Sequence, residues 1–168
     1  KALPLRSVEG TSRDGLPIMV SAPRLIDFDA FLALDREDKL TDFLAAHFEQ
    51  RSMVLHKLSL QQRRMVKFVD VRDMNGTSIM SLLSKGRPFI ARVKQLMQVI
   101  QDHYPEMVHQ VIMFNAPSAI SRIMAIVNTI LNERMRAKLK IFPVVDAYHE
   151  VIGRLTARAI MSWMKQMN

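Results

Sequence analysis

The chain of 168 residues contains no cysteine and only five glycines. Without cysteine, the sequence excludes disulfide frameworks, thiol chemistry and cysteine-based zinc sites, and it suits a reducing compartment. No Gly-Lys-Ser/Thr, Gly-x-Ser-x-Gly or Gly-x-Gly-x-x-Gly motif occurs, so neither a phosphate-cradling loop nor a hydrolase elbow is expected. These absences favour a protein that is not an enzyme.

Aromatic residues make up 7% of the chain and do not alternate with basic residues. A single-stranded nucleic acid platform needs stacking rings, so nucleic acid is not an expected partner. None of the five histidines falls in a His-x-x-x-His or His-Glu-x-x-His pair. We therefore expect no metal site and interpret the histidines as surface or structural side chains.

Long uninterrupted hydrophobic runs are also missing. The oiliest region, 111–132, is broken by Asn115, Pro117 and Arg122, which argues against a membrane span. The first residues, KALPLRSVEG, lack a continuous apolar core, so no signal peptide is expected. The chain begins at Lys1, which favours a piece of a longer protein.

The remaining composition is that of a folded domain, with 49% hydrophobic and 24% charged residues. The length fits one domain with a real core. Thirteen methionines suit either an adaptable core or an adaptable apolar pocket. The net charge of +8 indicates an anionic partner, but charge alone does not choose among a membrane surface, a phosphorylated lipid and a nucleic acid.

Hydrophobic periodicity predicts an alternation of strands and helices. Strands are predicted at 18–20, 65–71, 108–114 and 137–142, and helices at 37–55, 87–101, 118–131 and 145–167. A polar break is expected at 58–64, and Tyr104-Pro105 should stop the helix before it. This order is typical of an α/β domain with a largely parallel sheet.

Few side chains at the predicted strand ends could support chemistry. Asp70 and Asp73 are the nearest candidates, but Asp70 has no visible catalytic partner and a structural hydrogen-bonding role is favoured. In a strand over 137–142, Lys138 and Lys140 would share one face with Phe142. Two lysines on one face indicate either a sheet edge or a face that meets an anionic ligand.

Several motifs occur together in a particular order. They are RDGLPIMV, VKFVDVRDMNGTS, a helix, HYPE, an apolar strand ending in NAP, an apolar helix, and an Arg/Lys-rich segment ending in AKLKIF. Taken together, they resemble the CRAL-TRIO lipid-binding domain, the fold of phosphatidylinositol/phosphatidylcholine transfer proteins. The resemblance runs over about 14–142, within a single domain expected to span 1–168, and leaves 143–168 as an atypical helical segment.

The resemblance implies a mixed, largely parallel sheet that forms the floor of an apolar cavity, covered by helices and a gate helix. Residues 118–131 match the gate, and its apolar side comprises Ile120, Ile123, Met124, Val127 and Ile130. The implied ligand is a phospholipid, such as phosphatidylinositol, or another hydrophobic molecule, and no further cofactor is implied.

The resemblance also implies where a lipid headgroup lies. Glu106 and Lys138 match a glutamate and a lysine that pair near the headgroup in phosphoinositide-binding members. Thr77 and Ser78 match a hydroxyl-bearing turn that also contacts it. Lys140 is a further headgroup candidate, because it shares the face of Lys138 in the predicted strand.

The sequence departs from the family pattern at Met107, around Met135 and at Lys140. The implied function is non-enzymatic lipid binding, transfer or presentation at an anionic membrane surface, by a cytoplasmic protein peripheral to membranes. The alternative is a protein-interaction module, independent of lipid, within a larger signalling or trafficking protein.

Overall fold

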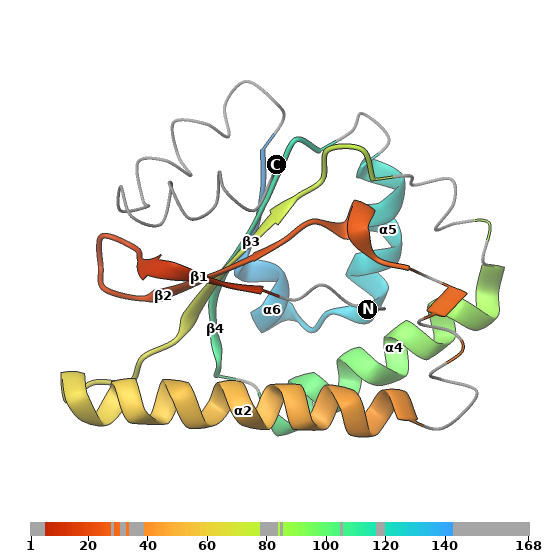
Figure 1. Cartoon of the computed structure of the whole chain (residues 1–168). Helices are drawn as coiled ribbons and strands as arrows, with labels where there is room; N and C mark the ends of the chain where they lie inside the picture. The colour runs from red at the N-terminus through yellow and green to blue at the C-terminus, as the bar shows by residue number, and fades with distance from the viewer. Residues whose placement is uncertain are drawn as a thin grey trace.

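The structure, a computed structural model, describes residues 6–27, 29–30, 33, 39–77, 84, 86–104, 106–116 and 120–142. Figure 1 shows their arrangement. The strands are β1 (Arg6–Thr11), β2 (Pro17–Ser21), β3 (Phe68–Asp73), β4 (Val108–Phe114) and β5 (Leu139–Ile141). The helices are η1 (Pro23–Leu25), α2 (Lys39–Gln62), α4 (Gly86–His103), α5 (Ile120–Ile130) and α6 (Glu133–Ala137).

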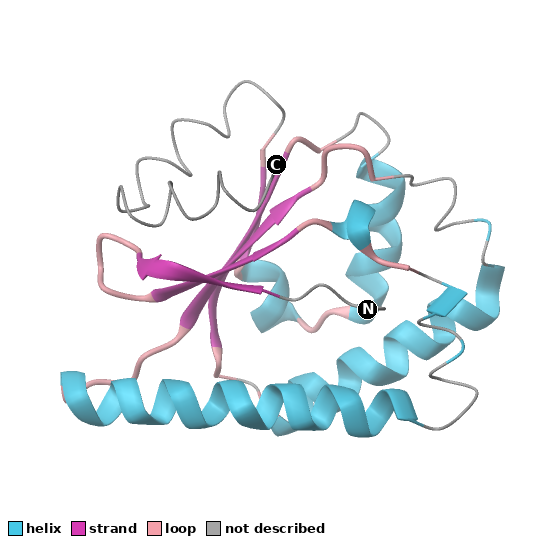
Figure 2. Cartoon of the chain, in the orientation of Figure 1, coloured by secondary structure: helices cyan, strands magenta, loops and turns pink. Residues whose placement is uncertain are grey.

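The five strands form one sheet in the order β1-β2-β3-β4-β5. β1 pairs antiparallel with β2, and every later pair is parallel, which confirms the prediction of a mixed, largely parallel sheet. Because the parallel strands follow one another in chain order and such crossovers are right-handed, their connecting helices belong on one face. Figures 1 and 2 show α4, α5 and α6 together on one side, with α2 beneath the amino ends of β3 and β4.

The sheet is the centre of the core. Register places the side chains of β2, β3 and β4 in alternating rows. One row is almost wholly apolar and buried: Ile18, Val20, Val69, Val71, Ile112 and Phe114. The other row, on the side of the connecting helices, also carries charge, at Asp70 and Arg72. Polar side chains therefore occur on both faces, since the buried Asp73 and Gln110 lie in the first row with its apolar residues.

Most predicted elements are present. The strand 108–114 is confirmed as predicted, and the helix that should stop before Tyr104-Pro105 ends at His103. In the turn after β3, Gly76 has a φ of +67°. The gate segment is helical over Ile120–Ile130. The predicted helix 145–167 lies outside the described residues.

The predicted break at 58–64 was placed too early, because α2 continues to Gln62. Ser59 explains the continuation: its hydroxyl donates to the Leu55 carbonyl at 2.7 Å and accepts from the Val66 amide at 2.9 Å. The helix ends where Arg63 takes a φ of 52°. β3 then starts at Phe68, not at Met65, whose side chain is 66% exposed.

Three elements were not predicted: β1, η1 and α6. β1 pairs along β2 although its sequence, RSVEGT, lacks apolar alternation. The short helix α6 occupies 133–137, where a strand was predicted to begin. Asn132 starts it by accepting a hydrogen bond from the Met135 amide at 2.9 Å. As a result, β5 is only three residues long.

Candidate functional site

Three strands receive the chain at one edge of the sheet, and a charged cluster lies there. Lys67 precedes β3, Glu106 precedes β4 and Lys138 precedes β5. Because these strands are parallel, their amino ends meet at the same edge. Arg134, from the first turns of α6, completes the cluster. Four charged side chains from distant parts of the sequence are thus brought together.

Glu106 is the only carboxylate among these four side chains. Lys67 donates to its Oε2 atom, and Arg134 Nη1 donates to its Oε1 atom at 2.9 Å. The Lys67 hydrogen bond, together with the positive charges of Lys138, Lys67 and Arg134, lowers the pKa of Glu106. The carboxylate therefore stays ionised, and three cations face one anion. The cluster carries an excess of positive charge.

Lys138 is the cation of this cluster that is not hydrogen-bonded. Its Nζ atom is buried without a hydrogen-bond partner in the described structure. Burial lowers the pKa of Lys138, an effect that Glu106 opposes and that Lys67 and Arg134 reinforce. A buried ammonium without an acceptor is costly, so the position favours an anionic ligand. Glu106 and Lys138, which the resemblance pairs, interact electrostatically here, while their headgroup role stays a prediction.

The prediction that Lys138 and Lys140 share a strand face was wrong. Lys138 ends α6 with helical backbone angles, φ −83° and ψ −11°, so the alternation of a strand does not reach it. Lys140 pairs with Ile112 in β5, on the row of buried core residues. Only Lys138 joins the charged cluster, while the headgroup role assigned to Lys140 stays a prediction.

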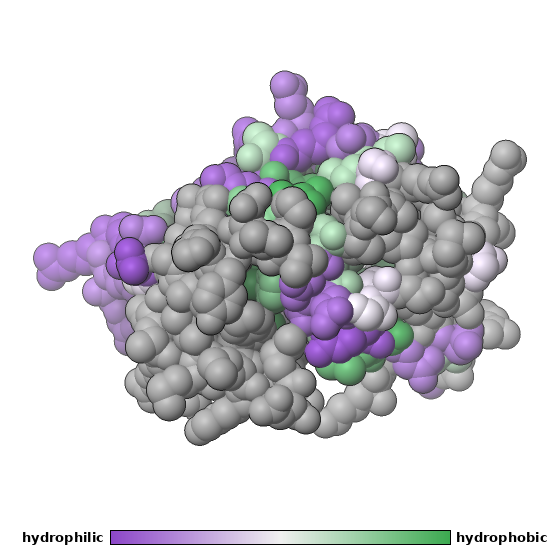
Figure 3. All heavy atoms as spheres, turned by 90° about the horizontal axis from the view of Figure 1, so that it is seen from above, coloured by the Kyte–Doolittle hydropathy of each residue, from purple (hydrophilic) through white to green (hydrophobic). Residues whose placement is uncertain are grey.

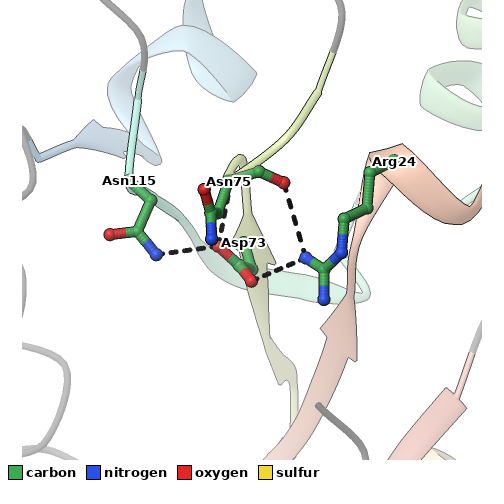
Figure 4. A network of polar contacts seen from close by, with 4 residues as sticks. All are labelled: Arg24, Asp73, Asn75 and Asn115. Atoms are coloured by element: carbon green, nitrogen blue, oxygen red, sulfur yellow. Dashed lines mark hydrogen bonds and ion pairs between the residues drawn. The ribbon is translucent and has the colours of Figure 1, made fainter. Parts of the chain in front are cut away.

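The opposite edge of the sheet holds a second polar network, built around Asp73 at the end of β3. Asp73 is completely buried, and its Oδ2 atom accepts from Arg24 Nη1 at 2.8 Å. Its Oδ1 atom accepts from the Asn115 side chain at 2.8 Å and from the Asn75 amide at 3.0 Å. Figure 4 shows these groups converging on one carboxylate. Asp73 thus ties together the chain segments that leave β2, β3 and β4.

This network holds the exit toward the gate segment. Asn115 has a φ of 53°, a left-handed conformation that asparagine tolerates better than most residues. Its side chain is fixed on Asp73 while the chain turns away from β4. The Asn-Ala-Pro motif is therefore anchored at its first residue by a buried carboxylate.

Thr77 lies at this second edge. Its backbone amide donates a hydrogen bond to the carbonyl of Met74, three residues earlier, at 3.1 Å. Its hydroxyl is buried without a partner among the described residues. Ser78 lies outside the described residues. Since β3 has six residues, Thr77 is separated from the Glu106 cluster by about 20 Å. The structure therefore does not bring the predicted headgroup residues into one site.

The gate residues can be placed in part. Met124, Val127 and Ile130 are half-buried on α5, whereas Ser121, Ala125, Asn128 and Thr129 are exposed. The side chains of Ile120 and Ile123 lie outside the described residues, although both positions share the apolar side of the helix. α5 therefore presents an apolar side to the protein and a polar side to solvent.

Apolar clefts lie between the helices. One of about 240 Å³ is lined by Phe48, Ile100, Gln101, Tyr104, Met107, Val108, Asn132, Arg134 and Met135. A second, of about 260 Å³, lies between α2 and α4. Each is smaller than the roughly 300–1,000 Å³ of typical ligand pockets. Figure 3, which looks down on the carboxyl ends of the strands, shows apolar residues at the centre of that face.

Sequence reasoning missed Lys67, Arg134 and Arg24 as partners of the acidic residues. A usable signal existed for Lys67, because it directly precedes a strand, as Glu106 does. No local signal identifies Arg24, which lies 49 residues from Asp73.

Within the described ranges, no three His, Asp or Glu side chains gather into a group that could hold a metal ion. In the same part of the chain, no helix is both long and apolar enough to cross a membrane.

Comparison with known proteins gives a family match and matches to solved structures. A family model for the CRAL/TRIO domain matches residues 6–155. A crystal structure of Sfh5 is similar, with a TM-score of 0.64 and 13% sequence identity, over 89% of this chain and 50% of that one. The chain thus spans half the length of that structure, and at such low identity the likeness concerns the fold. No curated protein matches the sequence.

Proposed function

Because the chain belongs to the CRAL/TRIO domain family, we propose that it binds a phospholipid without chemical conversion. The headgroup phosphate contacts Lys138 in the charged cluster, and the acyl chains lie between the helix-facing side of the sheet and α5. The chain carries such a lipid between membranes or presents it at an anionic membrane surface on the cytoplasmic side. Phosphatidylinositol is the first candidate.

The observation that carries this proposal is the buried Lys138 Nζ atom, which lacks a hydrogen-bond acceptor beside an excess of positive charge. A phosphate oxygen supplies the missing acceptor and offsets the charge of Lys138. Glu106 then orients Lys67 and Arg134, which already donate to it. The glutamate and the lysine thus have different roles, one structural and one ligand-binding.

The energetic basis is transfer of acyl chains from water, worth about 0.8 kcal/mol for each buried methylene. The described clefts are too small for two acyl chains, so binding requires α5 to move away from the sheet. The net charge of +8 attracts the protein to anionic membranes, at about 1 kcal/mol for each Lys or Arg near the surface.

Lys138→Ala tests the headgroup contact. We expect uptake of phosphatidylinositol from vesicles to weaken about ten- to hundredfold, since a hydrogen bond to a charged group contributes about 1.5–3 kcal/mol. Thermal stability should not fall, because the variant removes a buried cation without an acceptor. Equilibrium binding of a fluorescent phosphatidylinositol provides the measurement.

Arg136→Ala is the matched control, because Arg136 is exposed on α6 and donates only a long bond, 3.5 Å, to the Asn128 carbonyl. The control should bind phosphatidylinositol as the parent does. Equal binding by Lys138→Ala and the parent would show that Lys138 does not contact the headgroup.

A protein-interaction module is the second candidate. Its support is the exposed apolar surface of α2 and the turn after it, where Met53, Leu60 and Met65 are 72%, 67% and 66% exposed. Scattered exposed apolar residues are common in monomers, so this support is weaker. Mass spectrometry of the purified protein separates the two candidates, because only the first requires a bound lipid.

A further inference from the structure

The helix-facing side of the sheet carries charge in the middle of β3. Arg72 Nε and Nη2 donate to Asp70 Oδ2 at 3.0 and 2.7 Å. The Arg72 side chain is 41% exposed and that of Asp70 15%, although β3 is the central strand and this face is covered by helices. Solvent therefore reaches Arg72 on this face.

A second arginine faces the same place from α2. The Arg51 guanidinium lies 5.7 Å from the centroid of the Phe68 ring and 5.8 Å from that of Phe48. It interacts electrostatically with Asp70 and Arg72, and burial lowers its pKa to about 10, so it remains charged at neutral pH. Its Nε atom is buried without a hydrogen-bond partner in the described structure.

The aromatic contacts do not satisfy the hydrogen-bonding capacity of the Arg51 N–H groups. A ring face attracts the positive charge, but it does not replace an oxygen acceptor for each N–H group. Among the described residues, Asp70 is the carboxylate that interacts with Arg51, and it is already hydrogen-bonded to Arg72. Two guanidinium groups therefore share one carboxylate, and the group closer to the helices has an unused donor. Nearby His47, also on α2, has a buried Nε2 atom without a partner.

The neighbouring strands make the same face apolar. Val111 and Met113 of β4 lie opposite Asp70 and Arg72 in register, and Leu139 and Ile141 of β5 continue the row. Leu139 and Ile141 are only half-buried. A molecule lying across this face would meet cationic groups on β3 and α2, then an apolar surface on β4 and β5. This polarity matches an amphiphile with an anionic head.

We propose that Arg51 and Arg72 form an interior anion site, which binds the carboxylate or phosphate head of a single-chain amphiphile whose tail lies over β4 and β5. Arg51 is the principal donor, and Asp70 sets the affinity by holding Arg72. The site is separate from the Glu106 cluster, since neither arginine interacts with Glu106. This inference rests on the proposed lipid-binding function and specifies a second head group that the same cavity accepts.

Paired probes with and without the negative charge test the site. The carboxylate pair is the fluorescent fatty acid cis-parinaric acid and its methyl ester. The phosphate pair is oleoyl lysophosphatidic acid and oleoyl lysophosphatidylcholine, measured by displacement of the fluorescent acid. We expect the parent protein to bind the anionic member of at least one pair about tenfold more tightly or better, as one charge-assisted contact provides. The pair that discriminates identifies the head group as carboxylate or phosphate.

Two variants separate a binding role from a structural one. Arg51→Met should reduce binding of the anionic probe to the level of its neutral partner and leave the neutral probe unchanged. Asp70→Asn releases Arg72 for the ligand, so the affinity for the anionic probe should rise several-fold. If Asp70 instead serves only to hold the structure together, the substitution should weaken binding of both probes. Lys57→Met, an exposed position on α2, is the charge-matched control and should change neither.

Equal binding of charged and neutral probes by the parent would overturn the inference, as would equal losses for both probes in Arg51→Met. Failure to bind any of the probes would also overturn it. Uptake of phosphatidylinositol, measured on the same preparations, keeps the two proposals apart: the interior site can fail while phospholipid uptake persists.

Discussion

At the scale of single residues, the informative side chains are those whose polar atoms are buried without partners. Four such atoms occur among the described residues: His47 Nε2, Arg51 Nε, Thr77 Oγ1 and Lys138 Nζ. Folded proteins satisfy nearly all buried polar atoms, so each exception requires a reason. Lys138 and Arg51 are cations at sites with excess positive charge, and the proposed anionic ligands would satisfy both.

Glu106 gives a prediction about pH. Its pKa in the folded protein lies below the usual 4.5. The contribution of the ionised Glu106 carboxylate to folding stability is therefore fully present above pH 4.5. It is lost as the pH falls through the lowered pKa of the folded protein. Glu106→Gln leaves Lys67, Arg134 and Lys138 without their carboxylate, so its melting temperature at pH 7 should lie below that of the parent.

The difference in melting temperature between the parent and Glu106→Gln should shrink toward about pH 3, where most carboxyl groups are protonated. Thermal unfolding followed by circular dichroism between these two pH values provides the measurement. A difference that stays constant or widens at low pH would contradict the assigned role of Glu106.

The Asp73 network gives a prediction about stability. Arg24→Met leaves a completely buried carboxylate without its ion-pair partner, which typically costs about 3–5 kcal/mol. Urea unfolding measures this loss. The control is Arg13→Met, an exposed position in the same part of the chain, which should change stability by no more than about 0.5 kcal/mol. Equal effects of the two substitutions would mean that Asp73 does not need Arg24.

At the scale of elements, the long amphipathic and apolar segments could be predicted from the sequence. The strand Val108–Phe114 ends in a continuous apolar run, and α4 has an apolar side that ends at Tyr104-Pro105, so both have strong local signals. α6 could not be predicted in the same way, because the apolar alternation of 137–142 suggested a strand. The Asn132 cap was the overlooked signal, since asparagine begins helices readily.

This error had a consequence for the site. A strand over 137–142 places Lys138 and Lys140 on one face, whereas α6 turns Lys138 toward Glu106. The contacts of Lys67, Arg134 and Arg24 depend on chain segments far apart in sequence, and no local pattern encodes them. The motif residues Glu106 and Lys138 were identified by resemblance, but the hydrogen-bond partners of Glu106 and the unpaired Nζ atom of Lys138 required the structure.

Asn132 links the element to the site. Its side chain caps α6, and its amide donates to Gln101 of α4 at 2.9 Å. Asn132→Ala should cost about 1 kcal/mol of stability and should weaken phosphatidylinositol binding, because α6 positions Lys138. Asn132→Ser keeps a capping oxygen, so this variant should retain most of the stability and most of the phosphatidylinositol binding. Binding that is unchanged in Asn132→Ala would show that Lys138 is positioned without the cap.

At the scale of the whole molecule, the parallel sheet separates three polar regions. The Glu106 cluster lies at the amino ends of the strands and the Asp73 network at their carboxyl ends. The interior arginines lie on the helix-facing side, between apolar residues of β4, β5 and the helices. Such a molecule has polar contacts for a head group and apolar surface for a tail, with α5 as the element that must move.

The most direct measurement is the number of lipid molecules bound by each protein chain. The purified protein is incubated with phosphatidylinositol vesicles, re-isolated and examined by native mass spectrometry, followed by extraction and identification of the lipid. The account predicts one phospholipid per chain for the parent protein and strongly reduced occupancy for Lys138→Ala. A folded parent protein that takes up no lipid from these vesicles would contradict the account.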